Sequence, residues 1–173
     1  MDYDTKENWY AVFVTTGDED NVKERINYKF KEHLRAIVPK RKLRERKKGI
    51  WEDKLRTLLP GYVLLNGIIV NNEFEIIKGI PGVIRLLMSD DKPAHIEKYE
   101  IELIERLTCD GDIIERSKVY IVGNKVLVKE GPLLGMDGYI KSVDKRKGRV
   151  KVMMQLMGQP REVELSVELV ESA

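Results

Sequence analysis

The sequence predicts an α+β protein in two parts: an N-terminal antiparallel sheet with flanking helices, followed by a small all-β barrel. Up to residue 107, strand-like apolar segments interleave with segments of helical periodicity, which is typical of helices packed on a sheet. After residue 118 the apolar period becomes two over four or five short segments, which indicates a small closed barrel. The predicted boundaries are 1–107 for the first domain, 108–117 for a polar linker and 118–173 for the barrel.

The first two predicted elements are a strand and an amphipathic helix. Residues 9–15 (WYAVFVT) are aromatic and β-branched, which favours a strand. Asp18 can cap the N-terminus of the following helix, and the acidic residues beside it suit a first turn. The apolar stripe predicted for that helix recurs at four-residue steps and consists of Val22, Ile26, Phe30 and Leu34.

A charged hairpin and a second strand–helix pair are expected next. Strands on either side of Lys47–Gly49 would form the hairpin, and Pro60–Gly61 would turn the chain into a buried strand. The remaining elements are a short helix beginning at Asn71 or Asn72, a strand at 83–88 and a helix marked by Ile96, Tyr99, Leu103 and Leu107.

The predicted barrel strands are separated by glycine-containing turns. Val126 and Val128 alternate with lysines, and residues 150–156 alternate in the same way. The turns carry the sequences GPLLGMDG, DKRKG and MGQP, and Gly148 can take the positive φ that such a turn requires. So small a barrel leaves no room for an internal ligand, so its function is expected in its loops and outer face.

The composition offers little for catalysis or metal binding. Cys109 is the single cysteine and the chain has two histidines, which excludes an intrachain disulfide and a Cys/His metal site. No apolar stretch approaches the ~20 residues that a membrane span needs. We therefore expect a monomeric, cytoplasmic protein that has no enzymatic activity, no metal and no cofactor, and that acts by binding.

Four sequence elements occur in a fixed order: WYAV, LLPGYVLL, GIPGVIRLL and VGNKVLVKEGPLLGMDGYIKSVDKRKGRVKV. Together they resemble the NusG family of bacterial transcription elongation factors over nearly the whole chain. The resemblance implies an N-terminal domain of the NusG type (NGN-like) and a C-terminal SH3-like barrel of the KOW type. It also implies that the first domain binds the clamp helices of the largest subunit of RNA polymerase.

The resemblance places polymerase binding on an apolar surface beside the first strand and the PGY turn. The residues that it implies are Trp9, Tyr10, Leu58, Leu59, Pro60, Tyr62 and Ile84. A helix tip of the partner could bury apolar area here, at about 25 cal/mol of stabilisation per Å², with aromatic residues as anchors. The alternative is that this patch is simply core; strict alternation puts Trp9 and Tyr10 on opposite faces, so at least one should be accessible. The resemblance favours Tyr10 and Leu59 as docking residues, and it places residues 72–78 near the opposite polymerase jaw.

Two departures from the usual family pattern suggest a specialised member. Leu58–Leu59 replace a Phe-Phe pair before PGY, and Leu133 replaces the Phe that follows the Gly-Pro of the barrel. The second change affects a loop with which family members bind the termination factor Rho or a small-subunit ribosomal protein. With the basic loops, these departures resemble the LoaP-type antiterminators, which implies recognition of a nascent RNA signal, such as a structured hairpin, and suppression of termination.

Two basic clusters are candidate nucleic-acid contacts. The hairpin run KRKLRERKK could contact phosphates through Lys40, Arg41, Lys42, Arg44, Arg46, Lys47 and Lys48, with Leu43 turned inward. The candidate RNA contacts of the barrel are Lys129, Lys141, Lys145, Arg146, Lys147, Arg149, Lys151 and Arg161, with Lys141 and Lys151 predicted to point outward. The alternatives are a solvated hairpin and a solubilising turn.

Three functional hypotheses remain at this point. The first is a polymerase-bound factor that promotes processive elongation and antitermination and recognises RNA through the barrel loops. The second is a general RNA-binding or ribosome-associated protein. The third is a housekeeping elongation factor whose barrel binds Rho or a ribosomal protein.

Overall fold

The computed structural model describes residues 7–31, 33–70 and 72–171. The chain divides into two compact units, and each is assembled from two stretches of sequence. The first, which we call the sheet unit, comprises residues 1–38 and 59–101; the second, the barrel unit, comprises residues 39–58 and 102–173. No helix in the described part of the chain is both long enough and apolar enough to cross a membrane.

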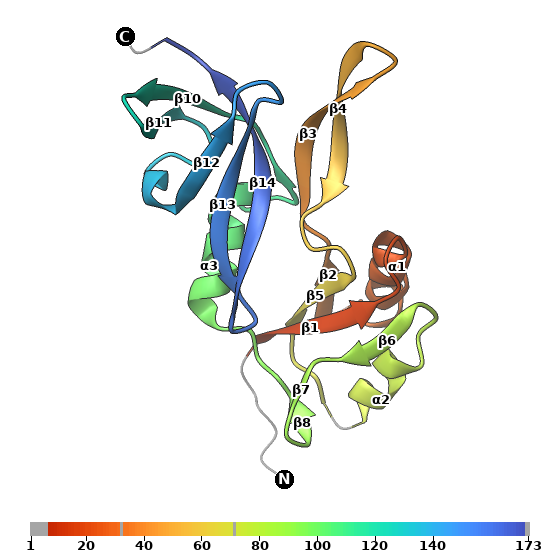
Figure 1. Cartoon of the computed structure of the whole chain (residues 1–173). Coiled ribbons are helices and arrows are strands. Elements are labelled where there is room, and N and C mark those ends of the chain that lie inside the picture. Colours follow the sequence, from red (N-terminus) through yellow and green to blue (C-terminus); the bar gives the residue numbers. More distant parts are fainter. Residues whose placement is uncertain (1–6, 32, 71, 172–173) are drawn as a thin grey trace. The chain divides into compact units, whose positions relative to one another are not determined.

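The sheet unit is built on a four-stranded sheet with the strand order β2-β5-β1-β6, in which β1 is antiparallel to β5 and to β6 (Figure 1). Its strands are β1 (Asn8–Val14), β2 (Leu34–Ile37), β5 (Tyr62–Gly67) and β6 (Val83–Leu86). Its helices are α1 (Glu19–Lys29) and α2 (Glu73–Lys78), and β7 (Met88–Ser89) and β8 (Lys92–Pro93) form a separate short ladder. Helix α3 (Lys98–Thr108) begins in this stretch.

One face of this sheet carries the apolar core of the unit. Tyr10, Val12 and Val14 alternate along β1 and pack in one cluster with Val22 and Ile26 of α1. Because successive strand residues point to opposite faces, the other side chains of β1 lie on the opposite face. That alternation decides which of the predicted docking residues are accessible.

The barrel unit contains a long hairpin and a five-stranded half-barrel (Figure 1). The hairpin strands are β3 (Lys40–Lys47) and β4 (Ile50–Thr57), and β9 (Ile113–Ile114) pairs in parallel with β3. The half-barrel has the order β11-β10-β14-β13-β12, and its strands are β10 (Ser117–Val122), β11 (Lys125–Glu130), β12 (Ile140–Asp144), β13 (Arg149–Leu156) and β14 (Gln159–Leu169). A short 3-10 helix (Asp137–Tyr139) precedes β12.

These elements confirm the predicted α+β fold followed by a small β-barrel. Some element ends were predicted wrongly: α1 ends at Lys29, and Leu34 begins β2, although its side chain is buried as the four-residue step indicated. The last helix begins at Lys98, after Ile96, and the strand at 83–88 ends at Leu86. Asn71 lies outside the described residues, and Asn72 occupies the N-cap position of α2. The segment 108–117 contains β9, and Lys40 N donates a 2.7 Å hydrogen bond to Asp112 O. The domain and linker boundaries stay predictions.

Candidate functional site

The residues predicted to bind polymerase divide into buried and accessible ones. Tyr10, Leu58 and Leu59 are 4%, 2% and 4% exposed, which corrects the expectation that Tyr10 and Leu59 are surface residues. Tyr10 belongs to the core because it shares a face of β1 with Val12 and Val14. Its ring also lies edge-on to His95, with 5.1 Å between the ring centroids.

The accessible members of the set are Trp9, Pro60, Tyr62 and Ile84. Trp9 and Tyr62 are half-buried, Pro60 is exposed and Ile84 is 56% exposed. An exposed isoleucine on a strand edge is an apolar surface that a partner can cover. The role of these four residues in polymerase binding stays a prediction.

Two residues that we did not single out join this surface. Phe13 pairs with Tyr62 on one side and with Arg85 on the other, so the three side chains share one face of the sheet. The Phe13 and Tyr62 rings meet edge-to-face at 5.3 Å, and the Arg85 guanidinium lies 5.5 Å from the centre of the Phe13 ring. The alternation along β1 was the available signal, since it places Phe13 on the same face as Trp9.

A buried carboxylate holds the PGY turn in place. Glu19 begins α1 and is 4% exposed. Its Oε1 accepts a 2.8 Å hydrogen bond from Gly61 N, and its Oε2 accepts a 2.9 Å hydrogen bond from Gly17 N. The turn that precedes Tyr62 is therefore tied to the loop between β1 and α1.

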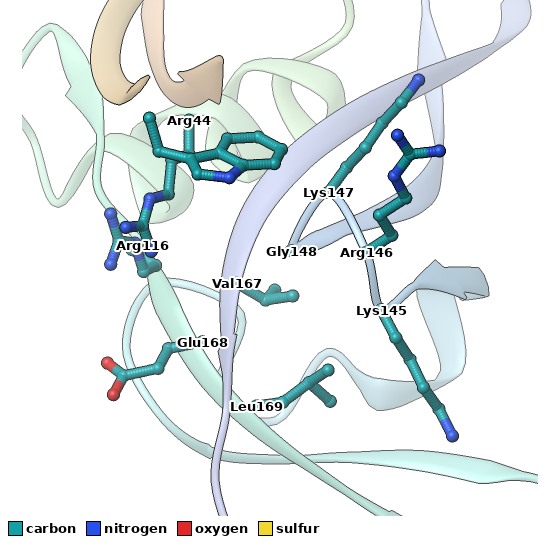
Figure 2. Close-up of a pocket in the computed structure, with 10 residues that line it drawn as sticks. Arg44, Arg116, Lys145, Arg146, Lys147, Gly148, Val167, Glu168 and Leu169 are labelled. Carbon is teal, nitrogen blue, oxygen red and sulfur yellow. The ribbon is translucent and has the colours of Figure 1, made fainter. Parts of the chain in front are cut away.

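A hollow of about 370 Å³ lies in the barrel unit between the hairpin and the loop that joins β12 to β13 (Figure 2). Its lining combines five cationic side chains, one carboxylate and a group of aromatic and aliphatic side chains. The lining residues are Arg44, Trp51, Arg116, Lys145, Arg146, Lys147, Gly148, Val167, Glu168 and Leu169. Figure 2 shows Arg146 and Lys147 on one side of this hollow and Arg116 on the other, while Lys145 extends away from Lys147.

The hairpin is fixed against the barrel by two half-buried arginines. Arg149 Nη2 donates to Arg44 O at 3.0 Å, and Arg149 Nη1 forms a 3.0 Å ion pair with Glu164. Arg41 Nη1 donates to Glu164 O at 2.7 Å, and burial lowers the pKa of the Arg41 guanidinium while the charge of Glu164 opposes that change. Both arginines were predicted to contact nucleic acid, but their hydrogen bonds give them a structural role in this unit.

Two exposed ion pairs complete the attachment of the hairpin, and a pair between its two strands stabilises the hairpin itself. Lys42 lies 2.9 Å from Glu115, and Arg116 lies 2.9 Å from Asp53. Within the hairpin, Arg56 donates two hydrogen bonds of 2.6 and 2.8 Å to Glu45, which lower the pKa of that carboxyl. The stabilisation from this pair is therefore present above the ordinary glutamate pKa and is lost as the pH falls through the lowered one.

We expect Arg149→Ala to loosen the hairpin. The substitution removes one hydrogen bond and one ion pair, so the free energy of unfolding of the barrel unit should fall by about 1–3 kcal/mol. Hydrogen exchange of the β3 and β4 amides should accelerate, and Arg46→Ala, which removes an exposed hairpin charge, serves as the control. Equal exchange rates in the two variants would contradict the anchoring role.

The basic residues predicted to contact nucleic acid differ in how exposed their side chains are to solvent. Those exposed in the barrel are Lys129, Lys141, Lys145, Arg146, Lys147 and Lys151, which confirms that Lys141 and Lys151 point outward. Those exposed in the hairpin are Arg44, Arg46, Lys47 and Lys48, whereas Lys40, Arg41, Lys42, Arg149 and Arg161 are half-buried. Leu43 is 4% exposed, which confirms its inward orientation. Lys151 lies 3.4 Å from Glu162, so part of its charge is neutralised.

The loop 145–147 presents the least neutralised charges near the hollow. Within the described part of the chain, the side chains of Lys145, Arg146 and Lys147 form no ion pair or hydrogen bond. The loop itself is fixed, because Lys147 N donates a 2.9 Å hydrogen bond to Asp144 Oδ1. Three free cations on an ordered turn are suited to binding phosphates.

Leu133, which replaces the usual Phe in the loop that family members use to bind Rho or a ribosomal protein, is buried. Leu133 is 1% exposed, and its backbone N donates a 3.0 Å hydrogen bond to Ser117 Oγ. The neighbouring Leu134 is 53% exposed, and its carbonyl accepts a 2.8 Å hydrogen bond from Arg106 of α3. Leu134 is thus the accessible apolar residue of this loop.

Comparison with known proteins identifies the family of the chain. The family model described as transcription termination factor NusG matches residues 7–105. The chain belongs to the NusG family. The chain is 32% identical to the transcription termination/antitermination protein NusG of Rickettsia bellii over 169 residues, which cover 94% of this chain and 88% of the relative. It is 30% identical to the NusG of Escherichia coli O6:H1 over 176 residues, which cover 97% of each chain.

A solved structure supports the same relationship. The structure described as domain interaction in Thermotoga maritima NusG matches with a TM-score of 0.60 and 27% identity, and the match covers 93% of this chain and 94% of that one. These findings confirm the predicted NGN-like sheet with a KOW-like barrel. As a NusG-family protein, the chain is a transcription termination/antitermination factor and not an enzyme.

Proposed function

We propose that this protein is a cytoplasmic antitermination factor that binds RNA polymerase through the sheet unit and nascent RNA through the barrel unit. The observation that carries the RNA part is the ordered loop 145–147, whose three cationic side chains are unneutralised within the described chain. Such a loop binds phosphates without needing a sequence code. The LoaP-like character suggested by the sequence belongs to this proposal.

The polymerase part of the proposal rests on the surface around Phe13. Tyr62 is the last residue of the PGY turn and lies opposite Phe13. Ile84 is exposed on the edge strand β6, and Trp9 lies further along β1, opposite Asn66. Glu19 holds the turn through Gly61 N. A rigid apolar surface binds a helix tip at a lower entropic cost than a mobile one. A factor that binds the elongating polymerase more tightly than the paused one would shift the enzyme toward elongation.

The polymerase contact can be tested with a substitution that spares the core. Ile84→Asp places a charge on an exposed strand residue, so we expect the fold to persist and polymerase association to weaken about tenfold. Tyr28→Asp, at a residue that is 77% exposed on α1, is the matched control and should bind normally. Co-purification of polymerase with each variant measures the effect, and equal recovery would remove Ile84 from the interface.

The RNA contact can be tested by charge removal from the loop. Replacing Lys145, Arg146 and Lys147 together with alanine should weaken the salt dependence of RNA binding. The slope of log K against log salt concentration should become shallower by about 2–3. A control with the same charge change replaces Lys29, Lys31 and Lys92, which are exposed in the sheet unit. Filter binding of the intact protein to a structured RNA at several salt concentrations gives both slopes, and identical slopes would count against the loop.

The direction of regulation needs a separate measurement. Transcription in vitro through an intrinsic terminator should yield more read-through product when the protein and its RNA signal are both present. The housekeeping alternative, in which the barrel binds Rho or a small-subunit ribosomal protein, predicts instead that read-through is indifferent to the loop 145–147. The burial of Leu133 disfavours this alternative, because the replaced aromatic position is not available to a partner in this structure.

A further inference from the structure

We propose that the hollow beside Trp51 receives one unpaired base of the nucleic acid, with its flanking phosphates held by Arg146 and Lys147. This inference rests on the proposed RNA binding and adds the part of the RNA that is recognised. Trp51 lies on β4 and is half-buried, and it lines the hollow together with Arg44 and the loop 145–148.

The size of the hollow indicates a single nucleotide rather than a duplex. At about 370 Å³ it falls near the lower end of the range for small-ligand sites. A base that has left its helix can enter such a space, whereas a paired base cannot. Unpaired bases in loops and bulges are also the parts of RNA that proteins most often recognise.

The chemistry of the lining matches the two parts of a nucleotide. The apolar part consists of Trp51, Val167 and Leu169, and it offers the flat and aliphatic surface on which a base stacks. The Arg44 guanidinium lies 6.0 Å from the centre of the Trp51 ring, so the indole already has a cation near it that can also contact a base. Figure 2 shows Arg146 and Lys147 across the hollow from Arg116, where phosphates attached to the base would pass.

The charges around the hollow favour an anionic ligand. Five cationic residues line it, and the single acidic one is Glu168, whose carboxylate points away from Arg146 and Lys147 in Figure 2. Arg116 is paired with Asp53, so it serves to position the hairpin rather than to bind phosphate. The cations that remain for phosphates are Arg44, Lys145, Arg146 and Lys147.

The hollow is held open by the hairpin anchors. In the hairpin, Trp51 lies opposite Arg46. Two residues away on the same face, Asp53 lies opposite Arg44. The bonds from Arg149 to Arg44 O and from Arg116 to Asp53 fix this face relative to the barrel. A preorganised site of this kind binds its ligand with less loss of conformational entropy than a flexible loop.

Fluorescence anisotropy with three labelled probes and the intact protein tests the inference. The probes are an RNA hairpin with one bulged adenosine, the same hairpin without the bulge, and a DNA hairpin with the bulge. Trp51→Ala should weaken binding of the bulged RNA by roughly 5- to 100-fold and leave the fully paired RNA unchanged. Trp51→Phe should recover most of the affinity, and Ile50→Ala, at a neighbour that is 64% exposed, should match the wild type.

A spectroscopic measurement separates stacking from a change in the hairpin. The chain has two tryptophans, so a Trp9→Phe background leaves Trp51 as the reporter. Its fluorescence should be quenched by the bulged RNA and not by the paired one. Quenching by the bulged DNA to the same degree would support the base site and identify an unpaired base in DNA as an equal ligand.

The outcomes distinguish this inference from the proposed function. If the alanine variant of loop 145–147 loses RNA binding while Trp51→Ala binds both RNA probes normally, the base site is overturned and the RNA-binding function stands. If the wild-type protein binds none of the probes, both are overturned. Equal loss of paired and bulged RNA on Trp51→Ala, without rescue by phenylalanine, would assign Trp51 to hairpin stability and overturn the base site.

Discussion

Replacing Glu19 with alanine is expected to lower the free energy of unfolding of the sheet unit by about 2–4 kcal/mol. The substitution removes the acceptor of two backbone N–H groups, one of which, at Gly61, is buried. A buried donor without a partner keeps its full desolvation cost, whereas Gly17 is exposed and can bond to water instead. The PGY turn would lose its attachment to α1 at the same time.

The measurement is thermal unfolding followed by circular dichroism, in which Glu19→Ala should lower the Tm by roughly 10–20 °C. Glu19→Gln is the matched control because its amide oxygen can still accept one of the two hydrogen bonds. Its Tm should fall about half as far. A Tm for the alanine variant equal to that of the wild type would show that the carboxylate does not hold the turn.

The second large effect is expected at Gly131, in the Gly-Pro motif of the barrel. Its φ is +106°, and a Cβ added there would lie 2.6 Å from Ser117 Cα and 2.9 Å from Ser117 Oγ. Gly131→Ala should therefore destabilise the barrel unit by roughly 2–5 kcal/mol through backbone strain and overpacking. The same clash would displace the serine hydroxyl that accepts the hydrogen bond of Leu133 N.

Gly123 provides the control for this prediction. Its φ is +60°, also in the left-handed region, but a Cβ built on it has no atom within 4 Å. Gly123→Ala should therefore cost only about 1 kcal/mol, the strain of the backbone conformation alone. Urea unfolding of both variants compares the two costs, and equal midpoints would mean that the approach to Ser117 is not limiting.

Much of the fold could be predicted because its signals are local. The alternation in β13, the turn glycines and the apolar stripe of α1 each depend on neighbouring residues. The end of α1 could not be placed, because Leu34 continues the helical spacing but is buried from a strand. Periodicity reports which side chains are buried and does not report which element buries them.

The candidate site was predicted less completely because it depends on contacts between distant segments. Alternation put Trp9 and Tyr10 on opposite faces but gave no means of telling which face the helices cover. The basic run of the hairpin was recognised as a patch, yet nothing near Arg149 in the sequence shows that it binds the carbonyl of Arg44, 105 residues away. Trp51 was seen only as a strand residue, since its place beside the loop 145–148 exists only after folding.

The inclusion of residues 39–58 in the barrel unit has a practical consequence for dissecting this protein. A fragment that starts at residue 118 would carry the loop 145–147 and Arg149, but it would lack Trp51, Arg44 and the other hairpin residues to which the barrel is anchored. If the proposed base site is correct, such a fragment would still attract any polyanion through its loop but would have no place for an unpaired base. Truncation would then leave attraction to phosphates without the ability to choose between nucleic acids.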